Sequence, residues 1–322
     1  MNVLLIGGMG FIGSHVASRF VQEGYEVDII DPQWNYLIHN QRCIDWLEEN
    51  YAYRKRNLLQ NVESLYHYAV TEYSPFPCKP YDYVVHLANF PLAGAAEKQP
   101  TKAIWYIDLL HRIIRASMPS TRFTYISSSM VYGNYEEDPI REDCQKEPVN
   151  VYGAVKLSQE MLVKLLCDRF SIPWTIVRPS AVYGPSDTNM RVIQKWLHQA
   201  FSNQPITVQS TNDMRMDFTY VTDTANGIFL ATTVDAGARQ IFNITRGEAR
   251  SLWEVVDLIK VYFEDVRVVE KAGNQNRPRR GASDITKAQK MLQYRPWYRL
   301  EDGLEKYVEY IYNQNHSLVE DR

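Results

Sequence analysis

The sequence predicts an α/β fold in which a doubly wound parallel sheet carries a smaller, partly interleaved C-terminal lobe. Two observations predict the sheet. Short apolar runs alternate with stretches whose apolar residues recur at helical spacing between residues 3 and 178, and this alternation is typical of parallel strands linked by helices. A cluster of glycines also joins the first apolar run directly to the first amphipathic stretch, which predicts a tight strand-to-helix turn.

The expected elements follow the chain in order. Strands are expected at residues 3–6, 25–30, 51–55, 81–87, 122–127 and 173–178, with long helices at 103–118 and 151–170. After Pro185 the pattern is less regular. It predicts helices at 191–201, 222–233, 252–263, 285–292 and 300–313, and short strands at 205–209 and 218–221. A chain of 322 residues can bury a large core, as one α/β unit or as two closely packed lobes.

The glycine cluster is predicted to bind a dinucleotide. Gly7, Gly10 and Gly13 have the spacing that allows a tight turn, close approach of the backbone to a pyrophosphate, and close packing of helix on strand. The N–H groups at the start of the helix, around Phe11 and Ile12, then face the phosphates.

The second expected strand leads into Asp31, 18 residues after Gly13. A carboxylate at this place can accept hydrogen bonds from a ribose diol and would repel a 2′-phosphate, which favours NAD over NADP. The alternative is an aspartate of an ordinary turn before Pro32. We therefore expect residues 1–185 to form an NAD-binding Rossmann domain, to which the chain returns around 215–235, and residues 186–322 to form mainly the substrate-binding lobe.

Composition excludes several classes of protein. The net charge of −3 gives no basic surplus for nucleic acid or an anionic membrane. No stretch approaches about 18 uninterrupted apolar residues, so we expect no membrane span, no signal peptide and a cytoplasmic protein. The cysteines Cys43, Cys78, Cys144 and Cys167 are far apart and form no paired motif, which predicts neither a metal site nor a disulfide framework.

Ser128, Tyr152 and Lys156 are the candidate catalytic residues. Tyr152 and Lys156 lie four apart near the start of a long helix and therefore share a face. An ammonium beside the phenol would lower the pKa of the tyrosine, as would a nearby oxidised nicotinamide. The phenol could then act as general base toward a hydroxyl that loses hydride to NAD, and Ser128 could hydrogen-bond the same hydroxyl.

With these residues in place, the chain resembles the extended short-chain dehydrogenase/reductases, specifically the NAD-dependent nucleotide-sugar epimerase/dehydratase group. The resemblance covers nearly the whole chain. Its motifs occur in the family's order: GGMGFIG, Asp31, VVHLAN, ISSSMVYG, YGAVK, IVRPSAVYGP, RMDFTYVTD and RPRRGASDITKA. The resemblance implies transient oxidation of a sugar carbon by tightly held NAD, with Ser128, Tyr152 and Lys156 as the catalytic triad.

The resemblance also implies which residues contact the ligands. Those expected at NAD are Gly7, Gly10, Phe11, Ile12, Gly13, Asp31, Asn57, Leu58, Leu87, Ala88, Asn89, Tyr152, Lys156, Pro179 and Val182. Those expected at the nucleotide sugar are Ser128, Ser129, Met130, Tyr152, Asn189, Arg215 and Arg280.

Some of these positions depart from the family's pattern. Asn57 stands in the third-strand position where the family often has an aspartate facing the adenine, and an asparagine can still hydrogen-bond the adenine amine. Arg215 is separated from the following Asp-Phe by Met216, whereas in many relatives the arginine directly precedes that pair. Arg279 competes with Arg280 for the second phosphate-binding role.

A further departure narrows the reaction. The family's 4,6-dehydratases carry an Asp-Glu pair directly after the triad residue, where this chain has Ser129 and Met130. A methionine cannot exchange a proton at neutral pH. Dehydration is therefore disfavoured, and so is decarboxylation, because related decarboxylases commonly keep the Glu. Epimerisation needs only oxidation, rotation of the keto sugar and return of the hydride.

We therefore expect a nucleotide-sugar 4-epimerase. The alternative is another reaction on the same triad, such as net 4-oxidation, dehydration or decarboxylation, and a non-catalytic NAD-sensing protein is a third hypothesis. Relatives commonly dimerise through two helices per subunit, which here are 103–118 and 151–170, so a homodimer is expected. The sequence names neither the base nor the sugar.

Overall fold

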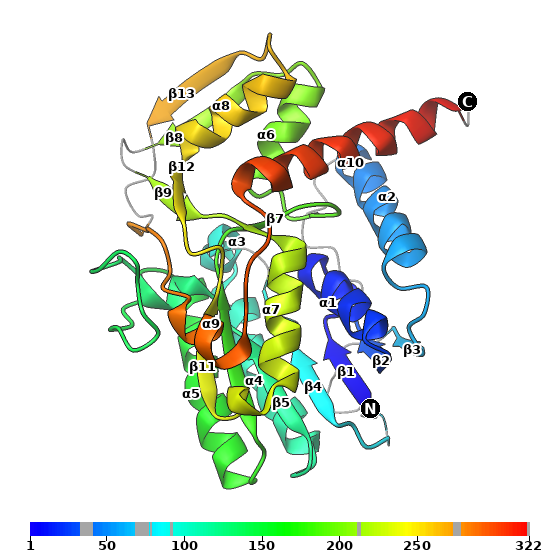
Figure 1. The fold of residues 1–322 in the computed structure, drawn as a ribbon, viewed down its shortest axis with the longest axis vertical. Coiled ribbons are helices and arrows are strands. Elements are labelled where there is room, and N and C mark those ends of the chain that lie inside the picture. Colours follow the sequence, from blue (N-terminus) through cyan, green and yellow to red (C-terminus); the bar gives the residue numbers. More distant parts are fainter. Residues whose placement is uncertain are drawn as a thin grey trace.

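The structure is a computed structural model that describes residues 1–32, 41–67, 77, 79–90, 93–210, 214–272 and 278–320. Two of the cysteines, Cys144 and Cys167, lie in this part of the chain and are free thiols. Cys78 and the side chain of Cys43 lie outside the described part. In Figure 1 a twisted parallel sheet with helices on both faces fills the lower half of the molecule, and a smaller group of helices and strands lies above it.

Within the described residues, seven strands form the main sheet in the order β11-β6-β5-β4-β1-β2-β3, and every neighbouring pair is parallel. Their bounds are β1 Asn2–Ile6, β2 Glu26–Ile30, β3 Ser64–Tyr66, β4 Tyr83–His86, β5 Arg122–Ile126, β6 Trp174–Pro179 and β11 Gln240–Ile244. The predicted doubly wound sheet is confirmed. The direction of winding reverses between β1 and β4, and in such sheets ligands bind beyond the carboxyl ends of the strands at that point.

One expected strand is wrong. Residues 51–55 lie inside helix α2, Gln41–Asn57, and the third strand in chain order is β3. The helix brings Tyr51 and Arg54, three residues apart, onto one face, where the guanidinium lies 5.1 Å from the centre of the tyrosine ring. The sequence also gave no sign of β11, which extends the sheet beside β6 from a region expected to belong to the smaller lobe.

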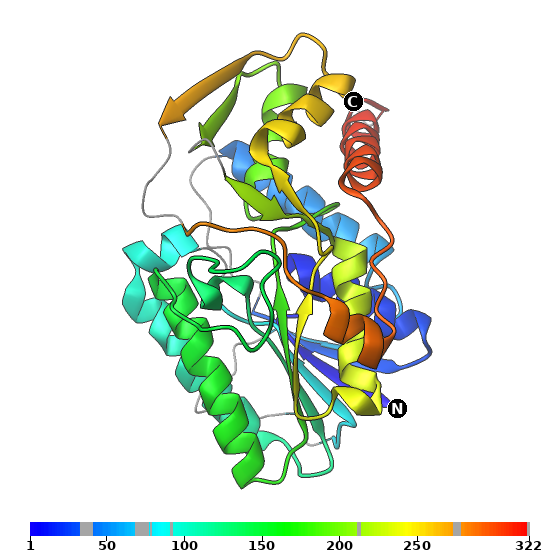
Figure 2. The same cartoon turned by 60° about the vertical axis from the view of Figure 1, so that its left-hand side comes forward.

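Helices cover both faces of the sheet, as Figure 2 shows from the side. Alternate residues of β1 point to opposite faces. Leu4 and Ile6 pack with α4, Pro100–Ala116, and α5, Val151–Arg169. Val3 and Leu5 pack with the helices of the other face, which are α1 (Phe11–Gln22), α7 (Val221–Thr233) and α9 (Thr286–Leu292). The chain thus returns to the sheet with α7, β11 and α9 after it has begun the smaller lobe.

The smaller lobe has a core of its own. Its elements are α6 Val192–Phe201, β8 Ile206–Ser210, β9 Arg215–Asp217, β12 Ala249–Ser251, α8 Leu252–Tyr262, β13 Val268–Ala272 and α10 Leu300–Glu320. β8 pairs with β13 in parallel, and β9 pairs with β12 antiparallel. Helix α8 begins with a capping box, in which Ser251 and Glu254 each accept a hydrogen bond from the other's backbone N–H.

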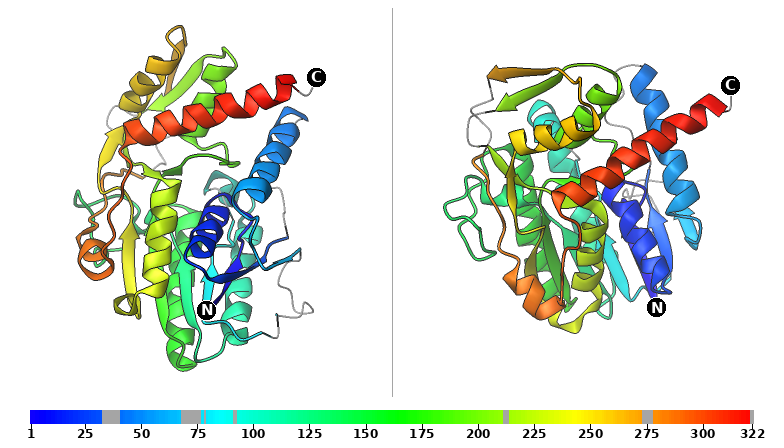
Figure 3. Two further views of the ribbon diagram at one scale, coloured as in Figure 1. Left: turned by 45° about the vertical axis from the view of Figure 1, so that its right-hand side comes forward. Right: turned by 45° about the horizontal axis from the view of Figure 1, so that its top comes forward.

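The remaining elements are short. Helix α3, Ala93–Lys98, packs on α4 and α5, the 3₁₀ turn η1, Ser129–Tyr132, lies on α5, and the 3₁₀ turn η2, Asp235–Gly237, links α7 to β11. Strands β7 Val182–Tyr183 and β10 Thr219–Tyr220 pair in parallel. The C-terminal helix α10 lies across α2, as both views of Figure 3 show. The Tyr310 hydroxyl donates to Asn50 Oδ1 at 3.0 Å, and the Tyr310 ring meets that of Tyr53 edge to face. Among the described helices, none is long and apolar enough to cross a membrane.

Candidate active site

A cavity of about 1370 Å³ lies between the carboxyl ends of the main strands and the smaller lobe. Single small-ligand pockets are typically roughly 300–1,000 Å³, so this cavity has room for two large ligands. Most of the expected site residues line it. They are Gly7, Gly10, Phe11, Ile12, Gly13, Asp31, Leu87, Ala88, Asn89, Ser128, Ser129, Met130, Tyr152, Lys156, Pro179, Val182, Asn189 and Arg280.

The glycine loop has the form of a cradle for a pyrophosphate. Gly7 has φ +86°, and a Cβ there would lie 2.8 Å from the backbone nitrogen of Ala88. A Cβ on Gly13 would lie 2.3 Å from the carbonyl oxygen of Gly7, so the first turn of α1 can rest on the loop only without a side chain. Helix α1 is capped by Gly10 with no side-chain hydrogen bond, which leaves its first N–H groups for an anion.

Asp31 follows β2 and completes this half of the cavity. Its carboxylate is buried and accepts a hydrogen bond from the N–H of Met9 at 2.9 Å, which places it beside the glycine loop. The glycine cradle, the uncapped helix N-terminus and a carboxylate at the end of β2 together fit a dinucleotide whose ribose carries free hydroxyls. These residues would hold NAD.

The two triad residues on α5 are placed by the cap of that helix. Asn150 accepts a hydrogen bond from the N–H of Gly153 at 2.8 Å, and Glu97 accepts one from the N–H of Val151 at 2.6 Å. A Cβ on Gly153 would lie 2.6 Å from the carbonyl oxygen of Met130. The glycine therefore lets turn η1 rest directly on the first turn of α5, which brings Ser128 to Tyr152.

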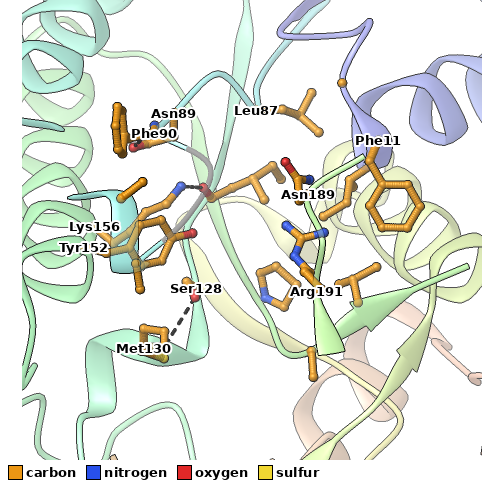
Figure 4. A pocket seen from close by; sticks show the side chains of 18 of the residues that line it. Phe11, Leu87, Asn89, Phe90, Ser128, Met130, Tyr152, Lys156, Asn189 and Arg191 are labelled. Carbon is orange, nitrogen blue, oxygen red and sulfur yellow. Dashed lines mark hydrogen bonds between the residues drawn. The ribbon is translucent and has the colours of Figure 1, made fainter. Parts of the chain in front are cut away.

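Ser128, Tyr152 and Lys156 gather on one side of the cavity, and Arg191 and Asn189 face them from the other (Figure 4). Ser128 caps η1 and accepts a hydrogen bond from the N–H of Met130 at 3.2 Å. Its side chain also lowers the pKa of Tyr152, which lies beside it in the cavity. The hydroxyl of Ser128 and the phenol of Tyr152 can therefore contact the same atom of a ligand in the cavity.

Burial and nearby side chains shift the pKa values of the triad residues. Burial raises the pKa of Tyr152, and the side chains that oppose this effect are Arg191, Ser128 and Arg280. Burial also lowers the pKa of Lys156 to about 7. The lysine ammonium lies 5.8 Å from the centre of the Tyr152 ring and donates to the carbonyl of Ile126 instead. The cations that lower the pKa of Tyr152 in this structure are Arg191 and Arg280, and the same effect of Lys156 stays a prediction.

A buried ion pair supports the triad from below. Glu160, one turn after Lys156 on α5, accepts hydrogen bonds from Arg178 at 2.8 and 2.6 Å and from the Ser127 hydroxyl at 2.6 Å. Both side chains of the pair are 1% exposed. Glu160 also raises the pKa of Lys156 against the effect of burial. The pair thus joins α5, β5 and β6 directly beneath the catalytic residues.

Arg280 brings a cation to the other half of the cavity. One of its terminal nitrogens donates to Ser129 Oγ at 2.8 Å and to Ser180 Oγ at 2.6 Å. Arg279 is exposed, donates to the carbonyl of Tyr135 and does not line the cavity. Of the two arginines that the sequence left as competitors, the structure therefore places Arg280 in the cavity.

These features agree with the comparison to protein families. The model of the NAD dependent epimerase/dehydratase family matches residues 3–245. The chain belongs to this family. NAD is accordingly the cofactor, and the suspected resemblance is confirmed.

Relatives match along the whole chain. A protein of Bacillus subtilis named uncharacterized UDP-glucose epimerase YtcB is 27% identical, over 97% of this chain and 98% of its own. UDP-glucuronic acid decarboxylase 1 of Danio rerio is 25% identical, over 96% of this chain and 72% of its own. The named reactions of these relatives differ.

Solved structures share the fold. The UDP-glucuronic acid 4-epimerase of Bacillus cereus, in complex with UDP-glucuronic acid and NAD, has a TM-score of 0.84 with 24% identity over 97% of this chain and 99% of its own. The NAD dependent-NDP-hexosamine 5,6-dehydratase TunA has a TM-score of 0.84 with 20% identity, over 97% and 98%.

Three of the residues expected from the family resemblance lie elsewhere. Arg215 is exposed, donates to the carbonyl of Ala249 and does not line the cavity, whereas Met214 and Met216 do. Side chains alternate along a strand, so the one residue inserted before Asp-Phe turns the arginine to the opposite face of β9. Asn57 ends α2, where its amide donates to the carbonyl of Tyr53, and neither it nor Leu58 lines the cavity.

Two arginines that the sequence analysis did not name, Arg54 and Arg191, are among the further residues that line the cavity. Arg191 precedes α6, lies 3.5 Å from Asp187 and holds its guanidinium 5.6 Å from the centre of the Phe11 ring. The only sequence signal for it is a basic residue in a loop after the sixth strand. Among the described residues, no group of histidine, cysteine and carboxylate side chains could hold a metal ion.

Proposed function

We propose that this member of the family is a nucleotide-sugar 4-epimerase. The observation that carries the proposal is that no described residue lining the cavity places a free carboxylate beside the triad. Met130 lies beside Ser128, and among the described residues that line the cavity, the carboxylates are those of Asp31 and Glu97. Asp31 is bonded to Met9 at the glycine loop, and Glu97 is bonded to the N–H of Val151.

The triad supplies one proton-transfer group. NAD, when bound in the cavity, would supply the reversible hydride transfer at C4 of the sugar. The phenolate oxygen of Tyr152 takes the proton of the C4 hydroxyl in the oxidation, and the resulting phenol returns it in the reduction, while Ser128 hydrogen-bonds the oxygen on C4. Arg191 and Arg280 favour the phenolate form of Tyr152, because a positive charge lowers the pKa of a phenol.

Elimination needs more than this. Removal of water requires one group that protonates the leaving hydroxyl and another that takes a carbon-bound proton. Met130 has no exchangeable proton to give. Epimerisation needs only that the keto sugar turns within the cavity after the oxidation. The same proton and hydride are then returned in the reduction, the hydride to the opposite face of C4.

Arg280, Arg191 and Asn189 support a nucleotide diphosphate at the other end of the substrate. Planar guanidinium groups form paired hydrogen bonds with phosphate oxygens. Arg280 reaches from the smaller lobe to the serine beside Ser128, so a diphosphate held there would place the attached sugar at the triad.

The test is a panel of nucleotide sugars with UDP, GDP, CDP and dTDP as the nucleotide. Products are separated by chromatography and weighed by mass spectrometry. We expect a new peak of unchanged mass, which NMR assigns to inversion at C4. The Tyr152→Phe variant, with the same ring and no hydroxyl, should give no such peak while it still binds NAD.

The other outcomes identify the alternatives. Loss of water or carbon dioxide from the product would overturn the interpretation of Met130. Loss of two hydrogens with accumulation of NADH would mean net oxidation. No turnover of any sugar by the wild type, with NAD bound, would contradict catalysis on this triad.

A further inference from the structure

Arg54 connects two parts of the cavity that lie far apart in the sequence. Its side chain, on α2, is completely buried. One terminal nitrogen donates to the carbonyl of Met9 in the glycine loop at 2.7 Å. The other donates to the carbonyl of Ser186 and to Thr188 Oγ1 at 3.1 Å. Ser186 and Thr188 belong to residues 184–191, between β7 and α6, which we call the substrate loop.

Met9 is held through both of its backbone polar groups, which belong to two successive peptide units. Its N–H donates to Asp31, and its carbonyl accepts from Arg54. A dinucleotide that lies on the glycine loop and reaches Asp31 with its ribose therefore acts on the same residue, Met9, that Arg54 holds. A change in the position of Met9 therefore moves the guanidinium of Arg54. The planar guanidinium transmits such a change to its other hydrogen-bond partners better than the flexible ammonium of a lysine would.

The substrate loop depends on such external bonds. Ser186 and Met190 have φ angles of +65° and +51°, a region that residues other than glycine rarely adopt without support. Between them Asp187 is fully buried, accepts a hydrogen bond from the N–H of Asn189 at 3.0 Å and pairs with Arg191. The bonds from Arg54 thus fix the part of the loop that presents Asn189 and Arg191 to the cavity.

His15 makes a second contact between the same two parts. It lies on α1, the helix that starts at the glycine loop, and its Nε2 is 3.2 Å from the carbonyl oxygen of Pro185. Burial lowers the pKa of His15 to about 4, so the ring is neutral at physiological pH and Nε2 carries the donated proton. The substrate loop is therefore bonded to the glycine loop through Arg54 and to α1 through His15.

We infer that Arg54 is a positioning residue that couples the binding of the dinucleotide to the conformation of the substrate loop, so that bound NAD orders the segment that receives the nucleotide sugar. The coupling rests on NAD as the cofactor. The identity of the substrate rests on the proposed function. A measurement that uses NAD alone therefore separates a failure of this inference from a failure of the proposed reaction.

The measurement is hydrogen exchange of the substrate-loop peptides, followed by mass spectrometry, in protein freed of NAD and in protein saturated with NAD. In the wild type we expect NAD to slow exchange of this loop by at least about fivefold, the lower range of couplings between sites. In Arg54→Met saturated with NAD, exchange should stay within about twofold of the NAD-free protein, because the bridge is gone. A role in stability alone would change exchange equally with and without NAD.

Two further variants make the result decisive. Arg19→Met is the matched control, because Arg19 on α1 donates to Asn226 and lies over the Phe229 ring, away from the cavity, and it should keep the wild-type response. Thr188→Val removes one hydrogen-bond acceptor of Arg54 and should weaken the protection of the substrate loop by NAD. This variant gives a test of the inference if Arg54→Met does not fold. Equal protection by NAD in the wild type, Arg54→Met and Thr188→Val, or no protection in the wild type, would overturn the inference.

Discussion

The ammonium of Lys156 donates a 2.6 Å hydrogen bond to the backbone carbonyl of Ile126, at the end of the strand that leads to Ser128. The bond ties helix α5 to the end of β5 within two residues of the catalytic serine. It also keeps a cation in a buried place, where the loss of solvation lowers the pKa of the lysine to about 7. Glu160 offsets only part of that loss.

This depressed pKa predicts how stability depends on pH in protein freed of NAD. Between the folded value near 7 and the ordinary value near 10.5, the unfolded chain binds one more proton at Lys156 than the folded chain does. The free energy of unfolding of the wild type, relative to Lys156→Met, should therefore rise with pH from 7 to 9, by at most about 1.4 kcal/mol per pH unit. Below pH 7 both states are protonated and the difference should be constant.

Urea denaturation of both proteins at pH 6, 7, 8 and 9 measures this difference. Lys164→Met, on the same helix but only half-buried, is the matched control and should follow the wild type across the range. A wild-type curve parallel to that of Lys156→Met would show that Lys156 remains charged in the folded protein up to its ordinary pKa.

A second prediction concerns the pH dependence of catalysis. The charge of Arg191 lowers the pKa of Tyr152 against the effect of burial. Removing that charge in Arg191→Met should raise the pKa of the phenol, so the acidic limb of kcat/KM against pH should move to higher pH. Arg191→Lys keeps the charge and should leave the limb near its wild-type position, even where KM rises. An unmoved limb in Arg191→Met would mean that another group controls the profile.

A third prediction separates two arginines that the family resemblance treats alike. Arg280 donates into the cavity, whereas Arg215 lies on the outer face of β9. Arg280→Met should raise KM for the nucleotide sugar by about 10- to 100-fold, the range expected for a lost charge-assisted hydrogen bond. Arg215→Met should change KM by less than about threefold, since it removes only a surface contact. The reverse order of effects would show that β9 turns over when substrate binds.

The sequence alone is informative where a feature depends on residues that are close together in the chain. The positions of Ser128, Tyr152 and Lys156 could be predicted, because the spacing of Tyr152 and Lys156 on one helix and the strand end before Ser128 are local features. The parallel, doubly wound character of the sheet could be predicted for the same reason, from apolar runs that alternate with helical patterns, whereas β3 and β11 could not. What lies within a few residues of a motif can be read from one chain.

The failures come from facts that a linear pattern does not contain. One inserted residue, Met216, turned Arg215 away from the cavity. Residues 51–55 contain two tyrosines, which favour strands, but a helix there buries Arg54 against loops more than a hundred residues distant. The pKa of Tyr152 depends on its burial and on Arg191, and neither can be predicted from the spacing between Tyr152 and Lys156. Contacts across the fold decided each of these cases.

A fourth prediction concerns the ion pair beneath the triad. Glu160 and Arg178 are both 1% exposed, so removal of one partner leaves a buried charge without compensation. Glu160→Gln should lower the free energy of unfolding by about 3 kcal/mol, the lower end of the range for a broken buried pair, because glutamine keeps one acceptor. Asp168→Asn, in the exposed pair with Arg239, is the control and should cost less than about 1 kcal/mol. Equal losses in urea denaturation would mean that the burial of the pair has little energetic effect.

The last prediction tests the expected homodimer. Helices α4 and α5 pack side by side, and their outer surface carries Ile104, Met161 and Leu165, which are 55%, 65% and 65% exposed in the single chain. We propose that a second copy of the chain covers these side chains, because burying apolar surface drives association. Light scattering with size-exclusion chromatography should show a dimer at micromolar concentration. The double variant Met161→Glu, Leu165→Glu should be a monomer, since two carboxylates on each copy would be buried without partners.

The matched control is Val261→Glu, because Val261 on α8 of the smaller lobe is apolar and similarly exposed, and this variant should remain dimeric. A monomeric wild type would reject the dimer, and a dimeric double variant would move the interface to another face.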